Sequence, residues 1–168
     1  MAFDATLLLQ LAANYSSATA YDFQSPVAPI PYGKQMAFTN GAGLNQADRI
    51  FADRRVLNAS TNDDLDLAGG LTDAFGATIT LARVKGIIVS SAIANAQNFT
   101  VGAGSNPLIN WISGTTPAII MRPGGTFMTI APDATGFAVT AATGDILRIA
   151  NGAGVAITYD IVIIGASS

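Results

Sequence analysis

Three side chains that often carry chemistry are missing from this chain. It contains no cysteine, no histidine and no glutamate, so that every acidic residue is an aspartate. Without cysteine there can be no disulfide bond, thiolate nucleophile or zinc–thiolate site. Without histidine there can be no Ser-His-Asp triad, and a general base would have to be aspartate or lysine. These absences exclude most of the common catalytic classes.

Charge of either sign is also scarce. Only 11% of the 168 residues are charged and 50% are hydrophobic, whereas about 25% of a typical soluble domain is charged. The formal net charge is −3, which provides no basic stripe for nucleic acid. So low a charge fits either a dense β core or a subunit that functions in an assembly, and we favour the second interpretation.

The missing glutamate and the presence of only two lysines also argue against a helical protein. Glutamate and lysine commonly fill exposed helix faces, whereas aspartate favours turns and caps. The apolar run at residues 5–13 has no preceding lysine or arginine, so we expect no export signal, and it is too short to cross a bilayer. No membrane partner is predicted.

The strongest strand signal lies at residues 77–92. Ile79 and Leu81 alternate with polar or small residues, which is the period of a half-buried strand. The run 87–89 is apolar on both faces and predicts a central strand with layers above and below it. Its expected partner is the apolar segment 155–165.

Further short strands and Gly- or Pro-rich turns fill the region after Val56. The predicted strands are 54–57, 64–67, 78–82, 84–92, 98–102, 118–122, 126–131, 136–140, 145–150 and 155–165, with a short helical crossover at 71–77. Residues 45–55 fit either one helical turn or the entry to a strand. About eight to ten short strands predict an all-β fold, a jelly-roll-type β-sandwich spanning residues 47–168.

Residues 1–46 form a different block, which we interpret as an N-terminal arm. Asp4 can cap a short helix, and the prolines in 26–31 exclude helix and most sheet pairing, so that this part should run extended. The arm either folds back on its own body or lies on a neighbouring subunit. Its candidate contacts to a capsid or a sister subunit are Leu7, Leu8, Leu11, Tyr15, Phe23, Val27, Ile30 and Tyr32.

No group of residues predicts catalysis, a metal or a cofactor. Asp63, Asp64 and Asp66 could supply oxygen ligands to calcium, but no glutamate completes a cage and their spacing suits a strand with one wet face. Arg54 and Arg55 either contact a partner or pair with these aspartates. Trp111 could stack on a sugar, although a lone tryptophan among apolar neighbours more often belongs to a core or an interface.

Several phrases in order resemble small virion proteins of tailed bacteriophages, above all the head decoration or cement class with a jelly-roll-like body. They are ADRIFADRRVL, DLDLAGGLTDAFGA, ARVKGIIV, RPGGTFMTIAPDATGFAV, TGDILRIANGAG and VAITYDIVIIGAS, which together span about residues 47–168. The resemblance implies a dimeric or trimeric subunit, made in the host cytoplasm, that binds the major capsid protein on the virion exterior and ties neighbouring capsomers together. The alternative is a tail or fibre component that binds a host glycan through the sandwich, with Trp111 as the stacking residue.

Overall fold

The computed structural model describes residues 3–16 and 27–168, in which strands are the regular elements and no helix could cross a membrane. The strands are β1 (Asp4–Ser16), β2 (Val27–Asn40), β3 (Gln46–Ala47), β4 (Arg49–Leu57), β5 (Asn62–Asp66), β6 (Leu71–Thr72), β7 (Thr78–Ile79), β8 (Arg83–Ser91), β9 (Phe99–Gly102), β10 (Ala118–Met121), β11 (Thr126–Ile130), β12 (Phe137–Ala138), β13 (Ile146–Asn151) and β14 (Ile157–Ala166). The predicted all-β class is confirmed.

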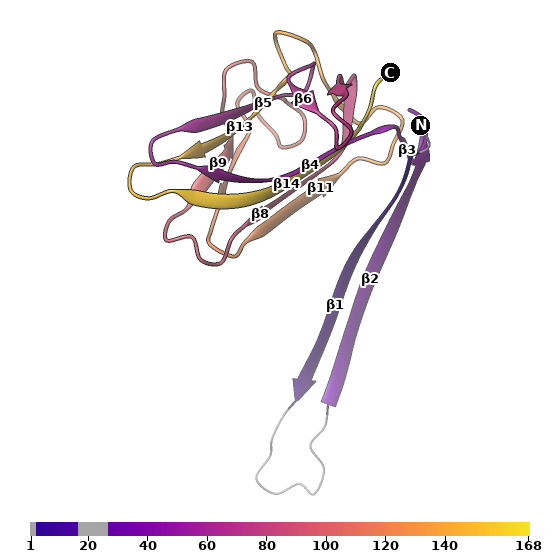
Figure 1. Ribbon diagram of the computed structural model, residues 1–168. Helices are drawn as coiled ribbons and strands as arrows, with labels where there is room; N and C mark the ends of the chain where they lie inside the picture. Colours follow the sequence, from indigo (N-terminus) through magenta and orange to yellow (C-terminus); the bar gives the residue numbers. More distant parts are fainter. Residues whose placement is uncertain (1–2, 17–26) are drawn as a thin grey trace, which may run out of the picture.

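Two antiparallel sheets build the body (Figure 1). One has the order β11-β8-β14-β4, with β12 also pairing with β8, and the other has the order β10-β9-β13-β5. The predicted pairing of the two most apolar strands is confirmed, because β8 and β14 lie side by side with Val89 opposite Ile161. This arrangement is consistent with a β-sandwich.

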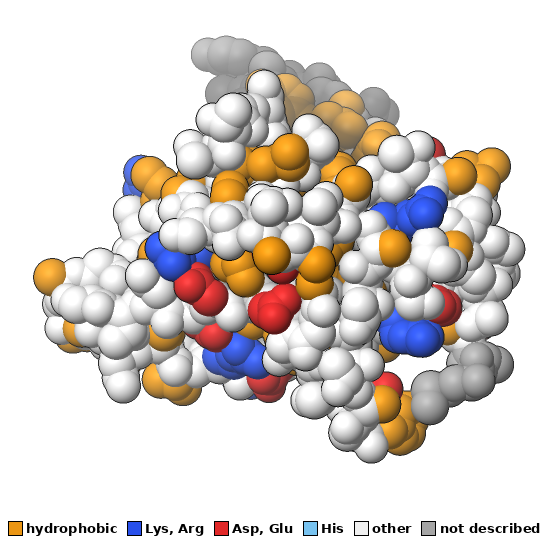
Figure 2. All heavy atoms as spheres, turned by 90° about the horizontal axis from the view of Figure 1, so that it is seen from above, with side chains coloured by type: hydrophobic (Ala, Val, Ile, Leu, Met, Phe, Trp, Pro, Cys, Tyr) orange, Lys and Arg blue, Asp and Glu red, His pale blue; other side chains and the backbone are white. Residues whose placement is uncertain are grey.

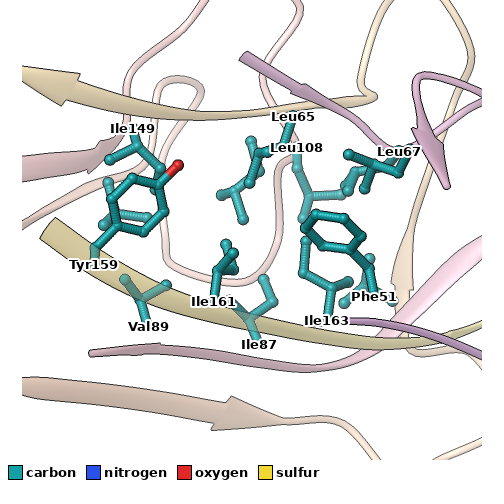
Figure 3. Packing of buried hydrophobic residues seen from close by; sticks show 14 of the residues in the cluster. Phe51, Leu65, Leu67, Ile87, Val89, Leu108, Ile149, Tyr159, Ile161 and Ile163 are labelled. Atoms are coloured by element: carbon teal, nitrogen blue, oxygen red, sulfur yellow. The ribbon is translucent and has the colours of Figure 1, made fainter. Parts of the chain in front are cut away.

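The space between the two sheets is filled by alternate side chains of each strand (Figure 3). Ile87 and Ile161 come from the five-stranded sheet and Leu65 and Ile149 from the other, and all four are almost completely buried. The alternation follows from the pleat, which sends successive side chains to opposite faces. On the outer face Ile88 is only half-buried, and its neighbours Val162 and Ile164 pack in the small cluster around Phe38, so the predicted second layer covers β8 only in part.

The predicted N-terminal helix is wrong. Residues 4–16 form β1, which pairs with β2 over its whole length, from Asp4 opposite Thr39 to Ser16 opposite Val27. Figure 1 shows the two strands as a long hairpin that projects from one end of the body. A short helix here would be marginal alone. In the hairpin, β2 instead provides hydrogen-bond partners for the backbone groups of β1 that point toward it, over the whole length of β1.

The expectation that the prolines of residues 26–31 exclude most sheet pairing is also wrong where the structure describes them, although the segment does run extended as predicted. The amide of Thr39 donates to the Asn45 carbonyl, on the side of β2 away from β1. Backbone groups two residues apart point to the same side of a strand, and the pairing has no bulge, so Pro29 and Pro31 also face away from β1. Their missing amides therefore interrupt no bond inside the hairpin.

The structure corrects the prediction for one short segment of the body and decides between two possibilities for another. Residues 71–77 contain no helical crossover: β6 and β7 pair with each other, and the Asp73 carboxylate accepts the amides of Phe75 and Ala77 in the intervening loop. Such local carboxylate bonds favour a turn over a helix. Residues 45–55, whose sequence fits either one helical turn or the entry to a strand, form a strand entry made of β3 and β4.

Candidate interaction surface

The projecting hairpin has two chemically different faces. Directly opposed residues of an antiparallel pair point to the same side, so the register sorts the side chains without ambiguity. One side, which we call the apolar face, carries Ala5, Leu7, Leu9, Leu11, Ala13 and Tyr15 from β1 and Ala28, Ile30, Tyr32, Lys34, Met36 and Phe38 from β2. The opposite face is mostly polar or proline-bearing. Lys34 is the one charged side chain of the apolar face.

The apolar face begins in the protein core and ends in solvent. Phe38 is completely buried in a small cluster with Ala47 and Ile164, against which Ala5 and Leu7 also pack. Farther along the hairpin the exposure rises to 52% for Leu11, 54% for Tyr32 and 74% for Tyr15. A strip that is apolar except for Lys34 thus leaves the body without being covered by it.

The structure brings together most of the residues proposed as partner contacts. Leu7, Leu11, Tyr15, Ile30 and Tyr32 all belong to the apolar face, and only Leu7 among them packs on the body cluster. Leu8 and Val27 lie on the opposite face, and Phe23 falls outside the described residues.

Leu9 was missed because a helical spacing of three and four residues groups positions 7, 8, 11 and 15. A strand spacing of two groups 7, 9, 11, 13 and 15, all of which are apolar. That unbroken series of apolar residues at every second position was the signal in the sequence that could have identified both the strand and its apolar face.

Lys85 fastens the base of the hairpin to the body. Its side chain is fully buried, and its ammonium donates to the carbonyls of Gly43 and Asp133. Burial lowers the pKa of the Lys85 ammonium, while the Asp133 carboxylate nearby opposes that shift. The Asn45 amide adds a 2.7 Å bond to the Pro132 carbonyl. The loop after β2 is therefore held to the body by direct hydrogen bonds.

Several charged side chains of the body pair with one another within the chain. Arg54 binds the Asp160 carboxylate and Arg148 binds that of Asp64, each through two hydrogen bonds. Arg55 binds Asp63, so internal pairing explains both arginines that had also been candidate partner contacts. Figure 2 shows red and blue side chains next to one another within a largely uncharged surface. Within residues 3–16 and 27–168, no three acidic side chains converge to hold a metal ion.

Tyr159 and Asp63 form a half-buried polar contact at one end of the core. The Tyr159 hydroxyl donates to the Asp63 carboxylate, which also accepts from Arg55 at 2.8 Å. Burial raises the pKa of the Tyr159 phenol, and the hydrogen bond to the Asp63 carboxylate raises it further. The phenol is therefore held protonated in the folded protein.

Alkaline pH should therefore destabilise the fold through Tyr159. Because the folded pKa lies above the ordinary value of 10.0, the unfolded chain loses this proton first. The stability that the protonated Tyr159 phenol contributes is fully present below about pH 10. Above that pH the free energy of unfolding should fall by about 1.4 kcal/mol per pH unit. We expect urea unfolding between about pH 9 and pH 11 to show this fall in the wild type and in the control variant Tyr32→Phe. The Tyr159→Phe variant should lack it. An identical pH dependence in the wild type and Tyr159→Phe would contradict the assignment.

Trp111 is part of the core. Its indole is 5% exposed, its ring packs edge-on against Phe127 with centroids 5.7 Å apart, and its Nε1 donates to the Leu108 carbonyl. The core placement expected for a lone tryptophan among apolar neighbours is confirmed. The ring consequently offers no free face on which a sugar could stack.

A hollow of about 360 Å³ lies where Phe3, Ile50 and Phe75 meet. Its charged side chains are already engaged within the chain, since Arg49 binds the Asp48 backbone and carboxylate, and Asp73 accepts loop amides. The apolar face therefore remains the stronger candidate. Comparisons with protein-family models, with curated proteins and with solved structures found no match for this chain.

Proposed function

We propose that this chain is a structural virion subunit of the decoration or cement class, which binds the outer surface of a capsid and ties neighbouring capsomers together. Residues 1–46 act as the arm and residues 47–168 as a jelly-roll-type body. The observation that supports this most is the apolar face, which is anchored in the core at Phe38 and exposed beyond Leu7.

An exposed apolar strip of this kind is unfavourable unless a partner covers it. Each square ångström removed from water contributes about 25 cal/mol, and contiguous apolar surface typically marks an interaction site. A two-stranded hairpin is also only marginally stable by itself. With 13 residues in β1, the hairpin extends about 40 Å, which is long enough to reach a neighbouring subunit on an assembled surface.

The strand order supports the jelly-roll part of the proposal. Eight main strands divide into the orders β4-β14-β8-β11 and β5-β13-β9-β10, and every connection between successive main strands except that from β9 to β10 passes from one sheet to the other. Eight strands in two facing sheets are typical of jelly rolls, which occur in viral capsid domains. The resemblance of residues 47–168 to decoration proteins points to the same function.

Co-sedimentation with undecorated heads of a tailed phage that encodes this chain tests the proposal. The full-length protein should bind saturably. The double variant Leu11→Asp with Ile30→Asp places two carboxylates on the apolar face and should weaken binding at least about 100-fold, because each charge would have to be buried. The matched control, Leu8→Asp with Val27→Asp, places the same charges on the opposite face and should bind as the wild type does.

Equal binding by the two double variants would remove the apolar face from the proposal. Failure of the wild type to bind heads would remove the cement function itself. The glycan-binding alternative relied on Trp111, whose ring is buried, so no observation currently favours it.

A further inference from the structure

The two long edges of the hairpin are unequally protected. The edge of β2 away from β1 lacks amide donors at Pro29 and Pro31, and near the body it is paired with β3. Among residues 3–16 and 27–168, no strand pairs with the edge of β1 away from β2. This edge contains neither proline nor glycine, so it offers an uninterrupted row of backbone donors and acceptors.

The register identifies which groups form this row. The backbone amides and carbonyls of Thr39 and the other odd-numbered residues of β2 point to the side of β3, away from β1. Those of the even-numbered residues of β2 therefore point toward β1. Their partners in β1 are odd-numbered, so the backbone groups of Leu8, Gln10 and Ala12 point to the unpaired edge. Natural proteins usually guard such an edge with lysine, proline or a bulge, and β1 has none of these among its described residues.

We propose that the unpaired edge of β1 binds β1 of a second copy of this chain, antiparallel and centred on Gln10. In this pairing, residues whose backbone groups point to the unpaired edge lie opposite one another: Gln10 opposite Gln10, and Leu8 opposite Ala12, of the other copy. A shift by one residue would break that match. On the apolar face it sets Leu9 against Leu11, so that four leucines meet at the centre.

Charge and symmetry favour a second copy as the occupant. The one charged residue of β1 is Asp4, at its end, and the antiparallel arrangement places the two Asp4 side chains at opposite ends of the junction, about 40 Å apart. No like charges therefore face each other across the central strands. The result is a twofold-symmetric sheet of the order β2-β1-β1-β2, which satisfies more backbone groups than the isolated hairpin does.

Both apolar faces lie on the same side of this four-stranded sheet, because its twofold axis is perpendicular to the sheet. The inference deepens the proposed function and rests on it for the role of the dimer: the edge of β1 binds the sister subunit, and the doubled apolar face is left for the capsid. The dimer itself can be measured without heads, so the two proposals fail separately.

Paired proline variants test the edge. Gln10→Pro removes an amide that points away from β2, whereas Gln35→Pro removes one that points away from β1, on the edge that already carries prolines. Sedimentation equilibrium should show a dimeric wild type, a dimeric Gln35→Pro and a Gln10→Pro variant whose dissociation constant is raised at least about 100-fold. A monomeric wild type, or equal behaviour of the two variants, would overturn the proposal.

A second pair of variants tests the register independently of stability. The chain has no cysteine, so Gln10→Cys introduces a single thiol. Opposed residues in such a pair have Cα atoms about 5.5 Å apart, within reach of a disulfide. Oxidation should link Gln10→Cys into a covalent dimer and leave Gln35→Cys unlinked; equal linking of both variants, or none of either, would overturn the register.

Discussion

Asp63→Ala is expected to lower the free energy of unfolding by about 3 kcal/mol, whereas Asp64→Ala should lower it by less than about 1 kcal/mol. The two residues are neighbours in β5 and differ in which side of the strand they occupy. Asp63 binds Arg55 and the Tyr159 hydroxyl, and its side chain is 21% exposed. Its removal leaves the buried hydroxyl without its acceptor, which costs more than the contact alone contributes.

Asp64 supplies the matched control for this prediction. Its side chain is 43% exposed and binds Arg148 through two hydrogen bonds of 2.6 and 2.7 Å. The Arg148 guanidinium lowers the pKa of the Asp64 carboxyl, yet water solvates both groups once the pair is broken. Urea unfolding of the two variants measures the difference, and equal losses would show that the Asp63 contacts add nothing beyond a surface ion pair.

Phe38→Ala is expected to cost about 3–5 kcal/mol, the range for truncating a buried phenylalanine. The ring is completely buried where the hairpin meets the body, in contact with the cluster formed by Ala47 and Ile164. The loss should fall mainly on the attachment of the hairpin. Amide exchange should therefore accelerate at Gly41 and Asn45, whose amides bond to the Ala47 and Pro132 carbonyls.

Leu9→Ala is the control for Phe38→Ala. Leu9 lies on the same apolar face but is 45% exposed, so its truncation should cost at most about 1 kcal/mol. Exchange at Gly41 and Asn45 should stay as slow as in the wild type. If Phe38→Ala left both the stability and these amides unchanged, the hairpin would have to be held by Lys85 and the loop hydrogen bonds alone.

The strands of the body could be predicted from local pattern, because each of them carries its own alternation of apolar residues. Ile157, Tyr159, Ile161 and Ile163 alternate inward along β14, and an alternation over so many residues fits only a strand. The pairing of Arg55 with Asp63 could also be anticipated, since the two residues lie close in the sequence. Arg54 and Asp160 are 106 residues apart, and no local pattern indicates such a partner.

The hairpin was harder to predict, because most of its sequence satisfies two periods at once. Leu7 and Leu11 share a face in a helix and also in a strand, and only Leu8 and Leu9 distinguish the two. Pro29 and Pro31 excluded a helix correctly but did not exclude a strand, since the outcome depends on which edge they occupy. That information exists only once β2 has a neighbour on one side.

The same two prolines limit how far the chain could assemble through its hairpin. A strand pair with two open edges would add further copies on both sides and grow into a fibre. Here β1 offers one open edge, while Pro29 and Pro31 leave the far side of β2 poor in donors. Growth through the hairpin would therefore terminate at two copies, so the protein could be present at high concentration and still yield discrete particles rather than filaments.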